Sequence, residues 1–299
     1  GLGDVYKRRA RHGAGARVAE DAARALRDAG VHIDVLVGHD AVEAADLAGK
    51  AARGSSDALA VVGGDGTVRL AVEATIGTGT PLAVIPAGSG NDVARTLGIP
   101  LGDPRAAAEV IVGGHRRQMD LGRVTFPDGR SALFTTVAAT GFDASVTERA
   151  IGMSWPRGQA RYTIAAMREL AALRSRYYQV RVDDERVEGD VVFAAVGNTT
   201  SYGGGMQITP NASIADGLLD VTLAHRPARF ARATMARVFP KVFSGKHITH
   251  PTVLTMRGRE VELYCDPPAL VSVDGDLVGM LPAVFEAVPD AVEVFVPGH

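Results

Sequence analysis

Hydrophobic and polar positions along residues 1–118 follow a rhythm of strands and helices. Apolar residues and alanines recur at helical spacing over 17–29, Gly30 is expected to end that helix, and 31–37 alternates as a strand does. Further helices are expected over 41–52, 68–76 and 92–97, and strands over 58–62 and 82–85. Strands that alternate with helices predict a parallel sheet covered on both faces, which defines an α/β domain.

The pattern changes near Met119, beyond which most segments have the pattern of short strands between turn residues. The expected strands begin near Leu121 and continue over 131–138, 178–182, 191–196, 218–223, 253–256, 260–264 and 270–273. Helices are expected over 162–173 and 229–243. This half of the chain therefore predicts a β-rich, antiparallel, sandwich-like second domain.

The first twelve residues do not fit this scheme. An α/β domain should open with a buried strand, whereas residues 1–12 show no apolar alternation and lead directly into a helix. We expect an N-terminus that is incomplete or replaced by a junction, and residues 1–12 are left out of the predicted fold.

Composition narrows the class of protein. A hydrophobic fraction of 46% is ample for a buried core, and a net charge of -2 gives no overall field that would attract nucleic acid. The single cysteine, Cys265, excludes a disulfide framework, and the sequence has no signal-peptide core. No apolar run reaches the roughly 18 residues needed to cross a bilayer. These features favour the cytoplasm, and a membrane ligand would be met at the membrane surface.

A glycine-rich loop follows the strand expected over 58–62. Its residues are Gly63, Gly64, Asp65, Gly66 and Thr67, and a helix begins directly after them. Glycines allow a ligand to approach the backbone, and a helix N-terminus directs N–H groups toward an anion such as phosphate. A tight βα turn without a ligand explains such a loop equally well. Asp65 favours a functional site, because a carboxylate in a phosphate cradle repels the ligand unless it holds a metal, a hydroxyl or a proton.

A second loop repeats this arrangement after the strand expected over 82–85. It contains Gly88, Ser89, Gly90 and Asn91 and leads into a helix beginning at Asp92. Ser89 or Asn91 alone is more simply explained as a helix N-cap. The carboxyl ends of adjacent parallel strands face one crevice, so the two loops together predict a nucleotide site.

Both loops resemble the catalytic domain shared by bacterial diacylglycerol kinases, related lipid kinases and sphingosine kinases. The first loop is also found in NAD kinases, whereas the second, over 86–95, is typical of the lipid branch. Further motifs of that family follow in the same order at 120–122, 141–144, 161–162, 198, 202–206, 210–212, 216–220 and 274–276.

The resemblance implies an NAD kinase-like and diacylglycerol kinase-like fold with two domains. The nucleotide-binding α/β domain would comprise residues 1–118 together with 284–299, where the last strand, over 291–296, returns to it. The β-rich domain for the lipid substrate and a metal would comprise residues 119–283.

The resemblance also implies roles for individual residues. The implied nucleotide-binding positions are Gly63, Gly64, Asp65, Gly66, Thr67, Ser89 and Asn91. Asp92 and Asp120 correspond to an acidic network around Mg²⁺, which together with Asp65 would serve catalysis. Asp216 corresponds to a metal ligand, assisted by backbone carbonyls near Ser213 and Leu218, and Asp276 to the catalytic base.

Two features depart from the family pattern. The family's first phosphate loop, an Asn-Pro-Thr-Ser-Gly-like turn, is absent, and residues 6–11 stand in its place. The base position carries Asp276 where glutamate is commoner, and the shorter side chain needs a closer hydroxyl or a bridging water.

The expected activity is transfer of the γ-phosphate of ATP, with Mg²⁺, to the hydroxyl of diacylglycerol or a related lipid. Alternatives are a sphingoid-base or ceramide kinase, an NAD-type kinase, and a non-catalytic binding protein of the same fold. The expected partner is lipid at the membrane surface, with no nucleic acid. Whether the chain forms a homodimer is left open.

Local sequence allows simpler interpretations of several of these features. Residues 274–276 and 216–217 both read as ordinary turns, since Asp-Gly is a common turn dipeptide. The helix expected over 229–243 has an apolar face and a basic face, so it could rest on anionic lipid, but packing against its own domain is favoured. His247 and His250 lack a third metal ligand nearby in sequence.

Overall fold

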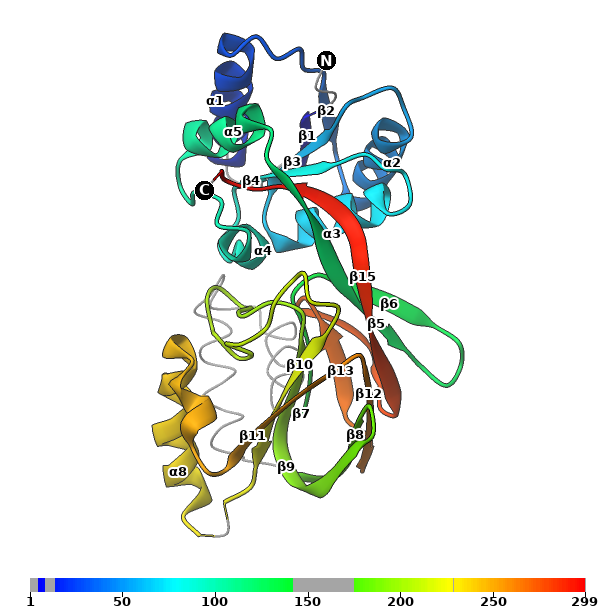
Figure 1. The fold of residues 1–299 in the computed structure, drawn as a ribbon, viewed down its shortest axis with the longest axis vertical. Coiled ribbons are helices and arrows are strands. Elements are labelled where there is room, and N and C mark those ends of the chain that lie inside the picture. The colour runs from blue at the N-terminus through cyan, green and yellow to red at the C-terminus, as the bar shows by residue number, and fades with distance from the viewer. Residues whose placement is uncertain (1–4, 9–13, 142–174, 228, 299) are drawn as a thin grey trace. The chain divides into compact units, whose positions relative to one another are not determined.

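The computed structural model describes residues 5–8, 14–141, 175–227 and 229–298 (Figure 1). The chain divides into two compact units. Unit 1 comprises Gly1–Asp120 and Asp290–His299, and unit 2 comprises Leu121–Pro289. The boundaries expected from the sequence lie after residue 118 and before residue 284.

Unit 1 contains a parallel sheet with the strand order β2-β1-β3-β4-β15. Its strands are β1 (Val5–Arg8), β2 (Val35–Gly38), β3 (Leu59–Gly63), β4 (Leu82–Pro86) and the end of β15 (Ala283–Phe295). The central strands β3 and β4 are almost fully buried, which explains their unbroken apolar sequences. The last strand pairs in parallel with β4 through Val294 and Leu82, so the chain's end returns to unit 1.

Helices cover both faces of this sheet (Figure 1). They are α1 (Ala14–Asp28), α2 (Ala41–Ala52), α3 (Asp65–Thr75), α4 (Asp92–Thr96) and α5 (Pro104–Gly113). Helix α1 packs with α5, and α2 packs with α3. No helix was expected from the sequence over α5, although Asp103 caps its N-terminus and Gly114 ends it in the left-handed region.

The exclusion of residues 1–12 from the fold was wrong. Strand β1 lies between β2 and β3, where Val5 pairs with both Val35 and Ala60. A strand with a neighbour on each side is held by backbone hydrogen bonds along both edges, and these do not require an apolar alternation in its sequence. The opening strand of the α/β unit is therefore present.

Unit 2 is built from antiparallel strands, in the order β14-β13-β7-β9-β8-β12-β15, and β10 pairs with β9 and β11. The strands are β5 (Arg116–Thr125), β6 (Ser131–Phe134), β7 (Val137–Gly141), β8 (Arg176–Val182), β9 (Glu185–Gly197), β10 (Leu219–His225), β11 (Val253–Gly258), β12 (Glu260–Asp266), β13 (Leu270–Val273) and β14 (Asp276–Met280). Strands β5 and β15 each contribute residues to both units.

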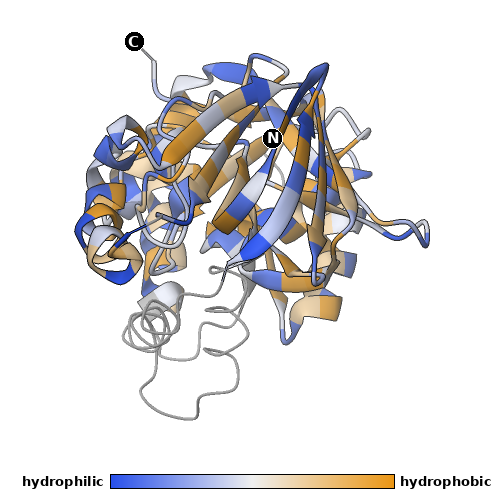
Figure 2. Ribbon diagram, turned by 90° about the horizontal axis from the view of Figure 1, so that it is seen from below, coloured by the Kyte–Doolittle hydropathy of each residue, from blue (hydrophilic) through white to orange (hydrophobic). Residues whose placement is uncertain are grey.

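Two apolar clusters lie on opposite faces of the β7–β9 pairing. Ala194 and Val196 belong to the cluster that contains Tyr178 and Phe285, whereas Ala195 belongs to a second cluster. Because both faces are buried, the second half of β9 is apolar throughout, while its exposed first half carries polar residues. Figure 2 shows hydrophobic and hydrophilic residues along the strands in orange and blue.

The second cluster is covered by α8 (Ala231–Val238), which supplies Met235, and by the 3₁₀ turn η1 (Phe239–Ser244), which supplies Val242. A second 3₁₀ turn, η2 (Lys246–Thr249), follows. The single helix expected over 229–243 is therefore divided, because Pro240 lacks the N–H that an α-helix interior requires. The helix expected over 162–173 lies outside the described residues.

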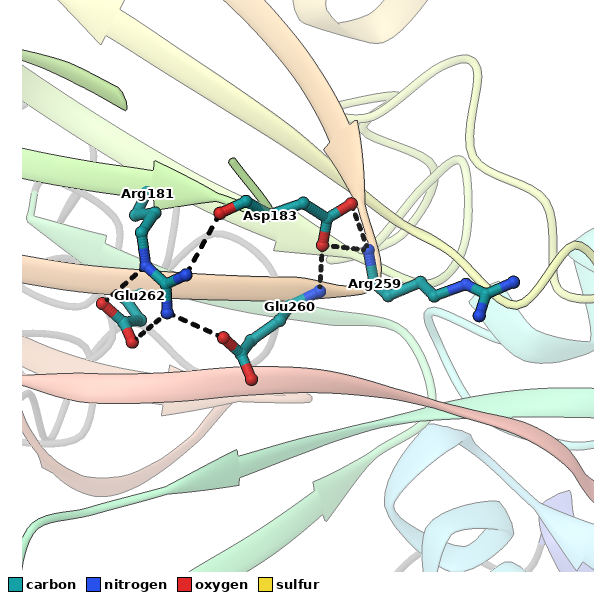
Figure 3. A network of polar contacts seen from close by, with 5 residues as sticks. All are labelled: Arg181, Asp183, Arg259, Glu260 and Glu262. Atoms are coloured by element: carbon teal, nitrogen blue, oxygen red, sulfur yellow. Dashed lines mark hydrogen bonds and ion pairs between the residues drawn. The ribbon is translucent and has the colours of Figure 1, made fainter. Parts of the chain in front are cut away.

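A polar network on the solvent side of unit 2 joins residues of β8 and β12, which pair antiparallel (Figure 3). Arg181 binds Glu262 and donates to Glu260 over 2.8 Å. The Asp183 carboxylate accepts from the backbone N–H groups of Arg259 and Glu260, each at 3.0 Å. A cavity of about 680 Å³ borders this network, and none of the predicted site residues lines it.

Candidate nucleotide and acidic sites

The two glycine loops of unit 1 touch through their backbones. Strands β3 and β4 are in register through Gly63 and Pro86, and Ala87 N donates to Gly63 O over 2.9 Å. A Cβ atom placed on Gly88 would lie 2.4 Å from the Cα of Gly64. Only a residue without a side chain permits this approach, so these glycines bring the loops together.

The first loop leads into α3, whose N-cap Gly64 makes no side-chain capping bond. Gly64 O accepts from Thr67 N at 2.8 Å and from Val68 N at 3.0 Å. A Cβ atom on Gly66 would meet no atom within 4 Å, so open space lies beside the first turn of the helix. A helix N-terminus beside open space suits a phosphate group.

Asp65 connects the first loop with α4. Its Oδ1 accepts from the backbone N–H of Val93 over 3.1 Å. This bond satisfies a donor in the first turn of α4, so Asp65 caps a helix that begins in the second loop. The interpretation of Asp65 as a sign of a functional site was therefore incomplete, because the side chain also has this structural role.

Asn91 fixes the second loop. Its Oδ1 accepts from Gly88 N at 2.9 Å, and its Nδ2 donates to Gly88 O at 2.8 Å. Asn91 has a φ of 56° and makes no capping bond to α4, so its side chain serves the loop and not the helix. Ser89, at the tip of the same loop, is exposed.

Asp92 and Asp120 are buried in unit 1. Asp92 Oδ1 lies 3.8 Å from Arg95 Nε, and Asp120 Oδ1 accepts from Asp290 N over 2.8 Å. The second contact ties β5 to the returning strand β15. Across the described parts of the chain, no three histidine, cysteine or acidic side chains group so that they alone could hold a metal ion.

In unit 2, Asp274 and Gly275 form the hairpin turn between β13 and β14, with φ values of 48° and 89°. The Asp274 carboxylate accepts from the N–H and hydroxyl groups of Thr135, at 2.8 and 3.0 Å, and of Thr136, at 2.8 and 2.6 Å. The hairpin interpretation of the sequence is thus correct. The turn is also anchored, and it presents an exposed Asp276 at the start of β14.

Two further observations extend this anchor. Asn198 donates from its backbone to Thr136 O at 2.8 Å and from Nδ2 to Thr135 O at 3.0 Å. Thr135 and Thr136 also divide the strand expected over 131–138 into β6 and β7. Sequence reasoning missed both threonines, because nothing local indicates a partner more than a hundred residues away.

Asp216 lies in the turn before β10. Its Oδ1 accepts from Leu218 N at 3.1 Å, and its Oδ2 lies 3.7 Å from Nη1 of Arg257. Ser213 Oγ accepts from Ala215 N at 3.4 Å. A carboxylate oxygen suits a hard cation such as Mg²⁺ chemically, although the Arg257 guanidinium competes for Asp216.

Arg257 also binds the buried Asp220, through Nε to Oδ2 at 2.9 Å and Nη2 to Oδ1 at 3.1 Å. Burial raises the pKa of Asp220, and the paired guanidinium opposes part of that rise. Sequence reasoning did not identify Arg257. The arginine links two acidic positions of the 216–220 turn.

A parallel α/β unit whose adjacent strands end in touching glycine loops, followed by an antiparallel β-rich unit, defines a kinase fold of the NAD kinase type. Residues 5–124 match the family model of the diacylglycerol kinase catalytic domain. Residues 136–296 match that of the YegS C-terminal NAD kinase beta sandwich-like domain. The chain belongs to the diacylglycerol kinase family and is a kinase, as the sequence predicts, and the predicted fold class is confirmed.

Individual relatives agree with this assignment. The chain is 43% identical to a diacylglycerol kinase of Mycobacterium tuberculosis, over 96% of this chain and 92% of that protein. It is 29% identical to a diacylglycerol kinase of Bacillus subtilis, over 85% and 82%. The crystal structure of a diacylglycerol kinase from Bacillus anthracis matches with a TM-score of 0.74 at 18% identity, over 99% and 96%. Yeast NADH kinase matches with a TM-score of 0.55 at 11% identity, over 99% and 84%.

Within the described residues, no helix combines the length and hydrophobicity that a bilayer crossing requires.

Proposed function

We propose that this kinase transfers the γ-phosphate of ATP, in a Mg²⁺-dependent reaction, to the hydroxyl group of diacylglycerol. Membership of the kinase family implies ATP as the phosphate donor. The identity of 43% to a protein named diacylglycerol kinase supports the lipid acceptor. The observation that carries the chemical role is the anchored turn, in which four hydrogen bonds to Asp274 hold an exposed Asp276 in place.

The loops of unit 1 are proposed to hold ATP. The N-terminus of α3 offers N–H groups beside Gly66, and Asn91 keeps the second loop in the conformation that Gly88 and Gly64 require. When bound, Mg²⁺ would spread the charge of the phosphates, with Asp216 and oxygens near Ser213 and Leu218 as its proposed holders. Asp92 and Asp120, both buried, are proposed to position the surrounding loops and strands.

Asp276 is proposed as the general base. Its carboxylate would accept the proton of the acceptor hydroxyl while that oxygen forms a bond to the γ-phosphorus, and the bond to the leaving ADP oxygen breaks. An exposed base on a fixed turn suits this role, because the proton acceptor must meet a bulky substrate in a defined direction.

Two alternatives differ in the acceptor. Sphingoid bases and ceramide also offer a primary hydroxyl beside apolar chains, but the relatives from Mycobacterium tuberculosis and Bacillus subtilis are named diacylglycerol kinases. An NAD-type acceptor has only the likeness to yeast NADH kinase, which at 11% identity concerns the fold. The anchored turn that presents Asp276 argues against a non-catalytic binding protein.

The test is Mg²⁺-dependent transfer of labelled phosphate from ATP to diacylglycerol, sphingosine, ceramide and NAD. Asp276→Ala and Asp65→Ala are compared with Asp184→Ala, a matched control at an exposed aspartate in the β8–β9 turn. We expect diacylglycerol to be the best acceptor, a loss of roughly 10²- to 10⁴-fold for Asp276→Ala, and no loss for the control. Asp276→Glu should retain activity. Transfer to none of the four acceptors would overturn the proposal.

A further inference from the structure

A basic segment, residues 229–246, runs along one edge of unit 2 through α8 and η1 (Figure 1). Its inner face packs into the unit, since Met235, Val238 and Val242 are buried. This much agrees with the interpretation favoured from the sequence. The outer side of the segment is not explained by packing.

Two phenylalanines near the ends of this segment face solvent. Phe230, the N-cap of α8, is 83% exposed, and Phe243, in η1, is 56% exposed. Each exposed phenylalanine leaves a large apolar area in water, which costs free energy in proportion to its area. Aromatic side chains at either end of an amphipathic helix are typical of helices that lie in a membrane interface.

All charged residues of the basic segment are positively charged. Its exposed cations are Arg229, Arg232, Arg237, Lys241 and Lys246. Residues 221–259 contain no aspartate or glutamate, although such residues number 34 in the chain of 299. Within the parts of the chain that the structure describes, no carboxylate forms an ion pair with these five cations. Among the described residues, the positive charge of the segment therefore has no carboxylate partner.

We infer that the basic segment is a docking surface for the anionic surface of a lipid bilayer. Cations attract the headgroups, and the two phenylalanines enter the boundary between headgroups and acyl chains. A single free phosphate would not use the phenylalanines, and an apolar protein partner would not require so many cations. The reason for such docking rests on the proposed function, because diacylglycerol resides in the membrane and the chain must reach it there.

Co-sedimentation with vesicles tests the docking without any need for activity. The full chain is mixed with phosphatidylcholine vesicles with or without phosphatidylglycerol, at low and at high salt. We expect binding that requires phosphatidylglycerol and weakens with salt. Arg229→Gln, Arg232→Gln and Arg237→Gln together should weaken it roughly 100-fold, at about fivefold for each cation. Phe230→Ser with Phe243→Ser should weaken it by roughly tenfold or more.

Matched controls remove the same groups elsewhere. Arg24→Gln, Arg27→Gln and Arg105→Gln take three exposed arginines from α1 and α5, and Val42→Ser with Val112→Ser takes two exposed apolar side chains from α2 and α5. Both controls should bind vesicles as the unmodified chain does. Binding that ignores phosphatidylglycerol, or that falls equally in the controls, would overturn the docking surface. Normal vesicle binding by the arginine or phenylalanine variants would also overturn it. The same holds if these variants differ from the unmodified chain only in self-association.

Activity on two forms of substrate separates this inference from the proposed function. A short-chain diacylglycerol dissolved as monomers needs no docking, so the arginine and phenylalanine variants should phosphorylate it at the rate of the unmodified chain. Their rate on long-chain diacylglycerol in anionic vesicles should fall in step with binding. If the unmodified chain phosphorylates neither substrate yet binds vesicles as described, the proposed function fails and the docking surface stands.

Discussion

The two units hold their candidate site residues by different means. In unit 1 the glycine loops fit because side chains are missing, and Gly64 and Gly88 touch through their backbones. In unit 2 the acidic turn is held by hydrogen bonds that the Asp274 carboxylate accepts from Thr135 and Thr136. A phosphate cradle needs open backbone N–H groups, whereas a general base needs a fixed direction. Each means of fixation suits the role that is proposed for its unit.

The largest loss of stability is expected when the Asp274 side chain, which anchors the acidic turn, is removed. Asp274→Ala deletes four hydrogen bonds, two of them to backbone N–H groups, and should lower the free energy of unfolding by about 3 kcal/mol. Asp276→Ala, two residues away and exposed, should lower the free energy of unfolding far less, while it lowers activity by roughly 10²- to 10⁴-fold. Urea unfolding of both variants measures this contrast. Equal stability of the two would break the view that the turn is anchored in order to present Asp276.

A slightly smaller effect is expected where backbone fit is disturbed. Gly88→Ala places a Cβ atom 2.4 Å from the Cα of Gly64, so the loops must separate at a cost of about 2 kcal/mol. Gly66→Ala is the matched control, because its Cβ atom enters open space and alanine favours the helix. Thermal unfolding should show a loss only for Gly88→Ala.

Gly66→Ala also sharpens the nucleotide assignment. Its added methyl group occupies the open space beside the α3 N-terminus, where phosphate is proposed to bind. Isothermal titration with ATP should therefore show weaker binding in this variant even though its stability is kept. Unchanged affinity for ATP would show that the phosphates do not bind at the N-terminus of α3.

Local patterns predicted the parts of the fold that local forces determine. Alternating strands and helices in unit 1 and short strands in unit 2 follow from hydrophobic periodicity, which each segment carries by itself. Strand β1 was missed because its place between β2 and β3 depends on neighbours and not on its own sequence. The break at Pro240 is a local effect that the sequence could have predicted, because proline is disfavoured in the interior of an α-helix.

For the candidate site, as for the fold, the local motifs could be predicted from the sequence and the long-range contacts could not. The glycine loops and the acidic turns could be found from motifs, because glycine and Asp-Gly have strong local conformational preferences. The contacts that fix them could not, since Asp274 to Thr136 and Asp120 to Asp290 join segments that are 138 and 170 positions apart. Such pairs depend on the completed tertiary fold.

The ion pair between Arg257 and the buried Asp220 also contributes to the stability of unit 2. Arg257→Ala removes the partner of the buried Asp220 and should cost about 1–2 kcal/mol, discounted because the arginine itself is partly exposed. Asp220→Asn should cost less, since burial already disfavours the carboxylate and raises its pKa. Chemical denaturation at neutral pH compares the two. A larger loss in Asp220→Asn would show that the ion pair stabilises more than its burial costs.

The raised pKa of Asp220 also predicts a dependence on pH. The folded state takes up a proton more readily than the unfolded state, so this contribution is complete below the ordinary aspartate pKa and is lost as pH rises through the raised value. Asp220→Asn should remove that part of the slope when unfolding free energy is measured against pH. If the slope of unfolding free energy against pH is unchanged in Asp220→Asn, other carboxylates are responsible for the pH dependence.

The smallest effect is expected at the exposed network of Arg181, Glu260 and Glu262. The hydrogen bond from Arg181 lowers the pKa of Glu262, so its contribution is present above the ordinary glutamate pKa and is lost as pH falls through the lowered value. Glu262→Gln should reduce stability only slightly near neutral pH, and salt should diminish even that difference. Unfolding curves of this variant at low and high salt measure it. A loss as large as that of Asp274→Ala would show that a solvent-exposed ion pair can anchor unit 2 as firmly as the turn that carries Asp276.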